Sequence, residues 1–123
     1  MIDALLKWMT SLSLAVAVAA CAGPQIYHPQ LSALDKGLAR AQVIERLSLP
    51  PLSERQVTVG KRVFEFDEYR MNNGMHTEAY FLAYEHERLV FWGYVAEYRR
   101  QPDVDLNLGL SMVLRYPVGE GKR

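Results

Sequence analysis

Apolar and polar residues alternate with a period of two from Val57 onward, which is typical of β-strands. Phe64 and Phe66 alternate with Glu65 and Asp67, as expected of a half-buried strand. An Asn-Gly pair within residues 71–75 tolerates the positive φ angles of a tight hairpin, and residues 85–88 form a second polar turn. We therefore predict a three-stranded antiparallel meander, with its later strands at about 76–84 and 89–98.

The second and third predicted strands are apolar on both faces. Trp92, Tyr94 and Tyr98 share one face of the third strand, and they form a candidate partner-binding surface because Trp and Tyr are enriched at interface centres. Two helices are enough to cover one face of a three-stranded sheet. The other face needs a partner or the C-terminal segment, so burial under residues 104–114 is the alternative interpretation of these aromatic residues.

Helical periodicity precedes the strands. Apolar residues recur at helical spacing on both sides of Gly37: Leu31, Leu34, Leu38, Val43, Ile44 and Leu47. Gly37 suits the left-handed cap that ends a helix, and Pro50-Pro51 terminates the second apolar stripe. Two short helices are therefore predicted between residues 31 and 48.

Residues 102–116 fit either a helix or a strand. Asp103 follows a proline, as at helix starts, and Leu106 and Leu110 lie on one helical face. Alternate leucines also suit a strand, and Gly109 weakens a helix. We favour a helix packed on the sheet. The predicted fold class is α+β, with two short N-terminal helices followed by a three-stranded antiparallel meander and a C-terminal helix.

An apolar run over residues 11–20 precedes Cys21, the only cysteine of the chain. The run has the length of a signal-peptide core and is too short to span a bilayer. The sequence Val18-Ala19-Ala20-Cys21 resembles the lipobox of bacterial lipoproteins. That resemblance implies cleavage before Cys21 and acylation of its sulfur and new amino terminus. An ordinary secretory signal and an uncleaved anchor helix are the alternatives.

The chain then divides into four predicted parts. Residues 1–20 are a lipoprotein signal peptide, 21–30 a lipidated tether, 31–116 one α+β domain, and 117–123 a loose tail. Pro24 and Pro29 prevent a regular helix in the tether. The mature chain is large enough to bury a modest core without disulfides.

Composition excludes several classes of protein. The chain has 14 basic and 14 acidic residues, and this neutrality argues against nucleic acid as a partner. A hydrophobic content of 50% excludes a disordered chain. His28, His76 and His86 do not have metal-ligand spacing, and no nucleophile elbow or phosphate-binding glycine loop occurs. We expect no catalytic residues, metal or cofactor, and therefore no enzyme.

Residues 34–50, Leu-Asp-Lys-Gly-Leu-Ala-Arg-Ala-Gln-Val-Ile-Glu-Arg-Leu-Ser-Leu-Pro, resemble a signature of the SmpA/OmlA (BamE-like) family of outer-membrane lipoproteins. The order of the aromatic strand at 63–66, a hairpin, and the run Arg-Leu-Val-Phe-Trp-Gly-Tyr at 88–94 also resembles this family. The chain departs from the signature at Ala39, where the family has a helix-capping Thr, and at Ser48, where it has Gly.

The resemblance implies a monomeric accessory or scaffold protein on the periplasmic face of the outer membrane, held by acyl chains at Cys21. Ala22 carries no acidic charge after the cysteine, which in lipoprotein families accompanies outer-membrane sorting. The implied process is outer-membrane assembly or maintenance through contacts with an envelope protein. The alternative is a lipoprotein of the same fold that binds a small molecule, the cell wall or an inhibitor-type target.

Overall fold

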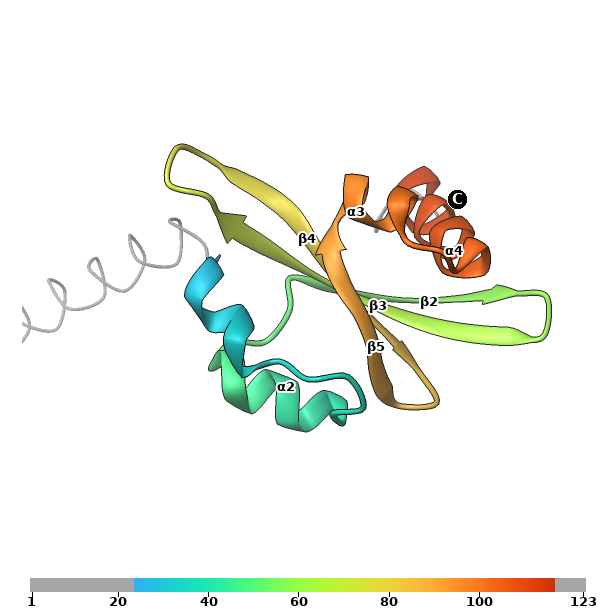
Figure 1. Ribbon diagram of the computed structural model, residues 1–123, viewed down its shortest axis with the longest axis horizontal. Helices are drawn as coiled ribbons and strands as arrows, with labels where there is room; N and C mark the ends of the chain where they lie inside the picture. The colour runs from blue at the N-terminus through green and yellow to red at the C-terminus, as the bar shows by residue number, and fades with distance from the viewer. Residues whose placement is uncertain (1–23, 117–123) are drawn as a thin grey trace, which may run out of the picture.

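The structure is a computed structural model that describes residues 24–116. Figure 1 shows a curled sheet with η1 and α2 on one side and α3 and α4 on the other. In chain order the elements are β1 (Ile26–Tyr27), the 3-10 helix η1 (His28–Ala33), α2 (Arg40–Leu47), β2 (Ser53–Val59), β3 (Arg62–Asn72), β4 (Thr77–Glu85), β5 (Arg88–Tyr94), α3 (Val95–Arg100) and α4 (Val104–Arg115).

The long strand β3 organises the mixed sheet. On one side it pairs antiparallel with β4, which in turn pairs with β5. Its other side pairs antiparallel with β2 and, near its C-terminal end, parallel with β1. The hairpin between β3 and β4 turns at Gly74, whose φ of 96° is favourable for glycine. Asn73 stabilises this turn because its side-chain oxygen accepts from Met75 N at 3.0 Å.

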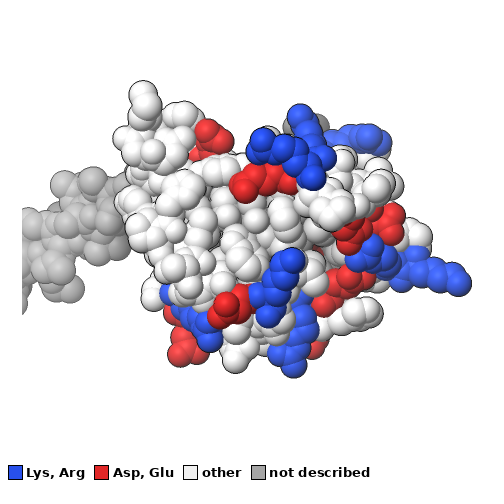
Figure 2. All heavy atoms as spheres, viewed as in Figure 1, with Lys and Arg blue, Asp and Glu red and all other residues white. Residues whose placement is uncertain are grey.

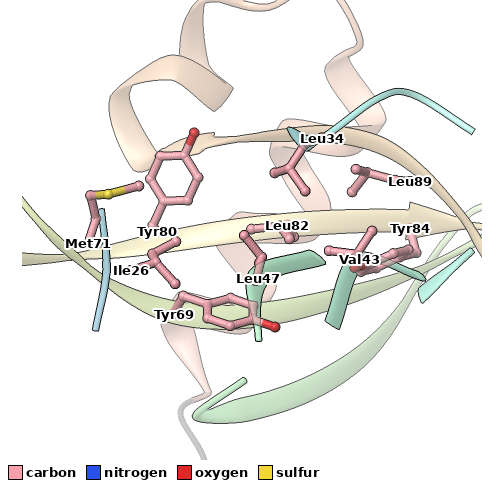
Figure 3. Close-up of a cluster of buried hydrophobic side chains, with 10 residues drawn as sticks. All are labelled: Ile26, Leu34, Val43, Leu47, Tyr69, Met71, Tyr80, Leu82, Tyr84 and Leu89. Atoms are coloured by element: carbon pink, nitrogen blue, oxygen red, sulfur yellow. The ribbon is translucent and has the colours of Figure 1, made fainter. Parts of the chain in front are cut away.

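One face of the sheet, the α2 face, packs against η1 and α2 (Figure 3). Val43 and Leu47 lie one turn apart on α2 and are buried, as helical spacing requires. The buried cluster between these layers consists of Ile26, Leu34, Val43, Leu47, Tyr69, Met71, Tyr80, Leu82, Tyr84 and Leu89.

The opposite face, the α4 face, packs against α3 and α4. A Cβ atom at Gly109 would lie 3.2 Å from the Phe66 ring, so glycine allows α4 to approach the sheet closely. The buried cluster on this face consists of Val57, Val59, Phe64, Phe66, Phe81, Ala83, Tyr98, Leu106, Leu110 and Val113.

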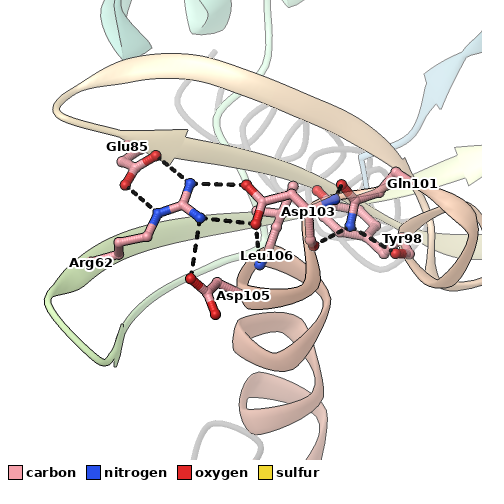
Figure 4. Close-up of polar contacts among 7 residues, drawn as sticks. All are labelled: Arg62, Glu85, Tyr98, Gln101, Asp103, Asp105 and Leu106. Atoms are coloured by element: carbon pink, nitrogen blue, oxygen red, sulfur yellow. Dashed lines mark hydrogen bonds and ion pairs between the residues drawn. The ribbon is translucent and has the colours of Figure 1, made fainter.

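A cluster of ion pairs fixes the start of α4 on the sheet (Figure 4). Arg62 donates to both oxygens of Glu85 at 2.9 and 2.8 Å and to both oxygens of Asp103 at 2.9 Å. Asp103 is the N-cap of α4 and accepts from Leu106 N at 3.3 Å. Hydrogen bonds from the Arg62 guanidinium lower the pKa of Glu85 and of Asp103.

The predicted architecture is wrong in its N-terminal half. In place of two short helices, a 3-10 helix is followed by an extended segment and a single α-helix, α2. Gly37 N donates to Leu89 O and Leu89 N donates to Leu38 O, both at 2.8 Å. These bonds to β5 satisfy main-chain donors and acceptors that would otherwise bond within a helix. The sheet is also larger than the predicted three-stranded meander, because β1 and β2 both pair with β3.

The third predicted strand ends earlier than expected, at Tyr94. The chain continues as α3, where Glu97 accepts from Tyr94 N at 2.9 Å and so satisfies a free donor at the helix start. Residues 104–115 form α4, the helix that the sequence favours over a strand. Leu106, Gly109, Leu110 and Val113 are its buried residues, and this spacing is helical.

The folded domain begins within the predicted tether. Ile26 is buried and pairs with Met71, so this residue belongs to the folded domain and not to a tether. The predicted signal peptide, Cys21 and the predicted tail at 117–123 lie outside the described residues. Within residues 24–116, no helix has the length and apolar character needed to cross a bilayer.

Candidate partner-binding surface

The structure brings together two of the three predicted partner-binding residues. Trp92 and Tyr94 lie on β5, half-buried against the cluster of the α2 face. Tyr98 lies on α3, is 0% exposed, and belongs to the cluster of the opposite face. Its hydroxyl donates to Phe81 O at 2.8 Å. The change from strand to helix after Tyr94 separates Tyr98 from the other two residues.

His28 completes the aromatic group around Tyr94. The Tyr94 hydroxyl and His28 Nε2 share a hydrogen bond of 2.9 Å, and the two ring centroids are 6.0 Å apart. On its other side, Tyr94 packs edge-on against Tyr80 with centroids 5.0 Å apart. Burial, together with the nearby carboxylates of Glu78 and Glu97, raises the pKa of the Tyr94 phenol. Sequence reasoning placed His28 on a tether, because two prolines obscured the short η1.

Glu78 and Glu97 lie near Tyr94, but the surface beyond them is largely uncharged. Figure 2 shows a largely uncharged area over η1 and the β3–β4 hairpin, whereas charged side chains gather around α2 and around α3 and α4. Tyr27 is 51% exposed beside η1, and Met75 at the hairpin tip is 93% exposed. A surface of this composition favours contacts with protein or lipid over contacts with polar small molecules.

The outer edge of β5 is only partly covered. The extended segment at 37–39 bonds to Leu89 and forms a bridge with Arg88. Among the described residues, no strand pairs with the outer edge from Phe91 to Tyr94. Glu97 covers the end of this edge, since it accepts from Tyr94 N and would lie 3.0 Å from a Cβ atom at Gly93. Before that point, an edge without a strand partner offers main-chain donors and acceptors to which an extended segment of another protein can add. Trp92 and Tyr94 lie on this stretch.

The three histidines do not come together with other metal-ligating side chains as a metal site in the described part of the chain. His28, His76 and His86 lie on η1, on the β3–β4 turn and on the β4–β5 turn. His76 Nε2 lies 3.0 Å from Glu78 Oε1, and both side chains are exposed. Over residues 24–116, no group of three or more metal-ligating side chains comes together.

Comparison with known proteins returned no match, whether to family models, to curated proteins or to solved structures. The resemblance to the SmpA/OmlA family therefore stays a prediction that rests on residues 34–50, 63–66 and 88–94. Acylation of Cys21 is likewise a prediction.

Proposed function

We propose that this chain is a lipid-anchored accessory protein of the outer membrane that binds an envelope protein through β5. The observation that carries the binding role is the pair Trp92 and Tyr94, half-buried on β5, the strand whose outer edge no other strand pairs along this stretch within residues 24–116. The small residues before Cys21 support the anchor. By resemblance, the process served is outer-membrane assembly or maintenance, and the role is attachment and recognition without catalysis.

The proposed anchor would hold the domain close to the lipid. Four residues separate Cys21 from the paired Ile26, so these two Cα atoms lie at most about 18 Å apart in a fully extended chain. Two or more acyl chains make membrane residence stable, whereas one chain gives only marginal binding. A domain confined in this way meets a membrane-bound partner at high effective concentration, so modest contacts at β5 are sufficient.

Site-specific photo-cross-linking tests the binding role. A benzoylphenylalanine at position 92, introduced in intact cells, is expected to cross-link an envelope protein that mass spectrometry identifies. The matched control is position 108, because Leu108 is 48% exposed on α4, on the opposite side of the sheet. Equal cross-linking of the same protein from both positions, or cross-linking from 108 alone, would contradict a partner site on β5.

The variant Trp92→Ala separates binding from folding. If Trp92 contacts a partner, the variant keeps its circular dichroism spectrum and loses the cross-link from a reporter at position 94. Loss of the fold itself would show that Trp92 acts as a core residue. Because Trp92 is half-buried, some loss of stability accompanies either result.

Fractionation tests the anchor separately. Cys21→Ala is expected to move the protein from the membrane to the soluble periplasmic fraction, and the intact mass of the parent is expected to include acyl chains. An unmodified sulfur, or a variant that remains in the membrane, would contradict the anchor without affecting the β5 surface.

A second candidate function, the binding of a small molecule or cell-wall fragment, has one observation in its favour. An open hollow of about 310 Å³ lies between the end of α4 and strands β3 and β4. Apolar Phe81 and Val113 line it together with polar Ser53 and Glu68. This volume is at the lower limit for ligand pockets. A thermal shift with cell-wall fragments that is abolished by Ala79→Trp would favour this function.

A further inference from the structure

The turn between β3 and β4 gathers around Asn73 the groups that a chemical change of its side chain requires. Residues 73–76 connect the two strands, and Asn73 N donates to His76 O at 3.1 Å. Asn73 and Gly74 are both exposed. An asparagine followed by glycine can form a cyclic imide when the glycine nitrogen attacks the side-chain carboxamide, because glycine has no side chain to obstruct the approach. The contacts of the Asn73 carboxamide favour each step of that reaction.

Two main-chain donors are directed at the side-chain carbonyl of Asn73. Its oxygen, Oδ1, accepts hydrogen bonds from Met75 N and from His76 N, both at 3.0 Å. When a nitrogen attacks this carbonyl, negative charge develops on the oxygen. Donors that are already in place stabilise that charge without reorganisation, as in the oxyanion hole of an acyl-transfer enzyme. The turn therefore lowers the barrier to attack on the Asn73 carboxamide.

The nitrogen that must leave lies beside an imidazole and a carboxylate. Asn73 Nδ2 is 3.4 Å from His76 Nε2 and 3.4 Å from Glu78 Oε1. His76 Nε2 in turn lies 3.0 Å from Glu78 Oε1. Because an ionised carboxylate only accepts hydrogen bonds, Glu78 favours the form of His76 that carries a proton on Nε2. That proton is within reach of the nitrogen that leaves as ammonia.

The attacking nitrogen is also held in place. Gly74 N donates to Asn72 Oδ1 at 2.8 Å, and Asn72 Nδ2 donates to Gln25 Oε1 at 2.8 Å. Hydrogen bonds in such a chain polarise one another, so the acceptor increases the electron density on Gly74 N. The peptide between Asn73 and Gly74, which takes part in ring closure, is thus fixed through its bond to β3.

We propose that Asn73 deamidates in the folded protein, with His76 as the general acid. Gly74 N attacks Asn73 Cγ and gives its proton to a water molecule, and the bond from Cγ to Nδ2 breaks. The protonated imidazole of His76 gives its Nε2 proton to the leaving nitrogen, which departs as ammonia, and regains a proton from solvent. Water then opens the cyclic imide at either carbonyl, which leaves aspartate or isoaspartate at position 73.

The product changes the charge of the hairpin. A carboxylate at position 73 adds a negative charge beside Glu78, at a tip where Met75 is 93% exposed. This tip belongs to the largely uncharged area over η1 and the β3–β4 hairpin in Figure 2. Deamidation therefore alters the surface chemistry of the domain irreversibly. The reaction does not depend on Cys21 or on β5, so it can fail without affecting the function proposed above.

Mass spectrometry of the full-length protein, incubated at neutral pH and then digested, tests the proposal. Trypsin releases residues 71–88, and fragmentation distinguishes position 72 from 73 and isoaspartate from aspartate. Loss of the amide at Asn73 is expected to be at least tenfold faster in the folded protein than in a synthetic peptide of residues 71–88, which lacks the preorganised contacts. Asn72 and Asn107 are internal controls, because neither precedes glycine, and both are expected to remain amides.

The variant His76→Gln removes the general acid but keeps the main-chain donors of the turn. It is expected to deamidate at least tenfold more slowly than the parent. The matched control is His86→Gln, which changes the histidine of the β4–β5 turn and is expected to leave the rate unchanged. Circular dichroism checks that each variant folds, and if His76→Gln does not, the comparison of the parent with the peptide decides. A folded parent that reacts no faster than the peptide, or a folded His76→Gln that reacts at the parental rate, would overturn the proposal.

Discussion

The two faces of the sheet differ in how they treat polar groups. The α4 face has a core of aliphatic and aromatic side chains, and its one buried hydroxyl, that of Tyr98, is bonded to Phe81 O. The α2 face buries the carboxylate of Asp67 and three tyrosines, and one of these, Tyr84, has a hydroxyl without a partner within residues 24–116. The α4 face thus provides stability by packing, whereas the α2 face retains polar groups that a packed core does not require.

The ion pair on the α2 face shows the energetic consequence. Burial raises the pKa of Asp67, and the hydrogen bond from Arg40 acts in the opposite direction. The Asp67 carboxylate in turn raises the pKa of Arg40. A buried pair of this kind contributes little net stability, but removing one partner leaves a charge without compensation. Trp92 and Tyr94, the residues proposed to bind a partner, pack on this face.

The largest expected loss of stability comes from truncating a core side chain on the α4 face. Phe66 is 1% exposed and packs against Tyr98 and the close approach at Gly109. Phe66→Ala is expected to lower the free energy of unfolding by about 3–5 kcal/mol, through lost burial and the cavity that remains. Urea denaturation measures this, with Val63→Ala on the same strand as the exposed control. A loss below about 1 kcal/mol would show that α4 collapses into the gap.

The next largest effect is expected from the α2 face. Arg40→Ala leaves Asp67 buried and is expected to cost about 2–4 kcal/mol at pH 7, less than for a fully buried pair because Arg40 is 28% exposed. The loss should shrink at acid pH, because a protonated Asp67 carries no charge. The double variant Arg40→Met/Asp67→Leu is expected to recover most of the stability. A double variant as unstable as Arg40→Ala would contradict this interpretation of the pair.

A matched pair of hydroxyl deletions compares the two faces directly. Tyr98→Phe removes a buried hydrogen bond and is expected to cost about 1–2 kcal/mol. Tyr84→Phe removes a hydroxyl without a partner in the described chain, so it is expected to be neutral or slightly stabilising. Thermal unfolding of the two variants side by side gives the result. An equal loss in both would mean that an ordered water bonds the Tyr84 hydroxyl.

Local patterns predicted the turns better than the architecture. The Asn-Gly turn and the alternation of Phe64 and Phe66 depend on near neighbours. The turn forms at residues 73–76, two residues shorter at its start than the predicted 71–75, and residues 62–72 extend as β3. The prediction has no separate β2, because the polar side chains at 53–56 resemble a solvated loop and the turn at Gly60 divides what was expected to be one strand. The segment at 34–39 has helical spacing, but its bonds to Leu89 connect residues about 50 positions apart. No local pattern reports such a contact.

The candidate site residues also divide into those that local patterns identify and those that depend on contacts distant in the sequence. Trp92 and Tyr94 were identified from composition and strand periodicity, and both lie on β5. Tyr98 was assigned to the wrong face because the strand was extended through α3, although Glu97 three residues after Tyr94 indicates a helix start. The groups that surround Asn73 are local, whereas the contact of this turn with Gln25 depends on the pairing of β1 with β3.

The smallest expected effect concerns pH and the Arg62 cluster. Arg62 lowers the pKa of Glu85 and Asp103, so their stabilising contribution is present above the unfolded-state values of about 4 and is lost as the pH falls through the folded-state values. Asp67 has the opposite sign, because its pKa is raised and protonation favours the folded state. Arg62→Met should therefore make the unfolding free energy less dependent on pH between about 5 and 3.

The change should remain below about 1 kcal/mol, because Arg62 and Asp103 are each about one-third exposed and solvent screens them. Arg46→Met is the matched control, since it breaks the more exposed pair of Arg46 with Asp35 and is expected to leave the free energy of unfolding almost unchanged. If Arg62→Met keeps the full acid dependence, carboxylates elsewhere govern it. Since Arg62 joins Glu85 of β4 to Asp103 at the start of α4, that result would also mean that these ion pairs add little to the attachment of α4 to the sheet.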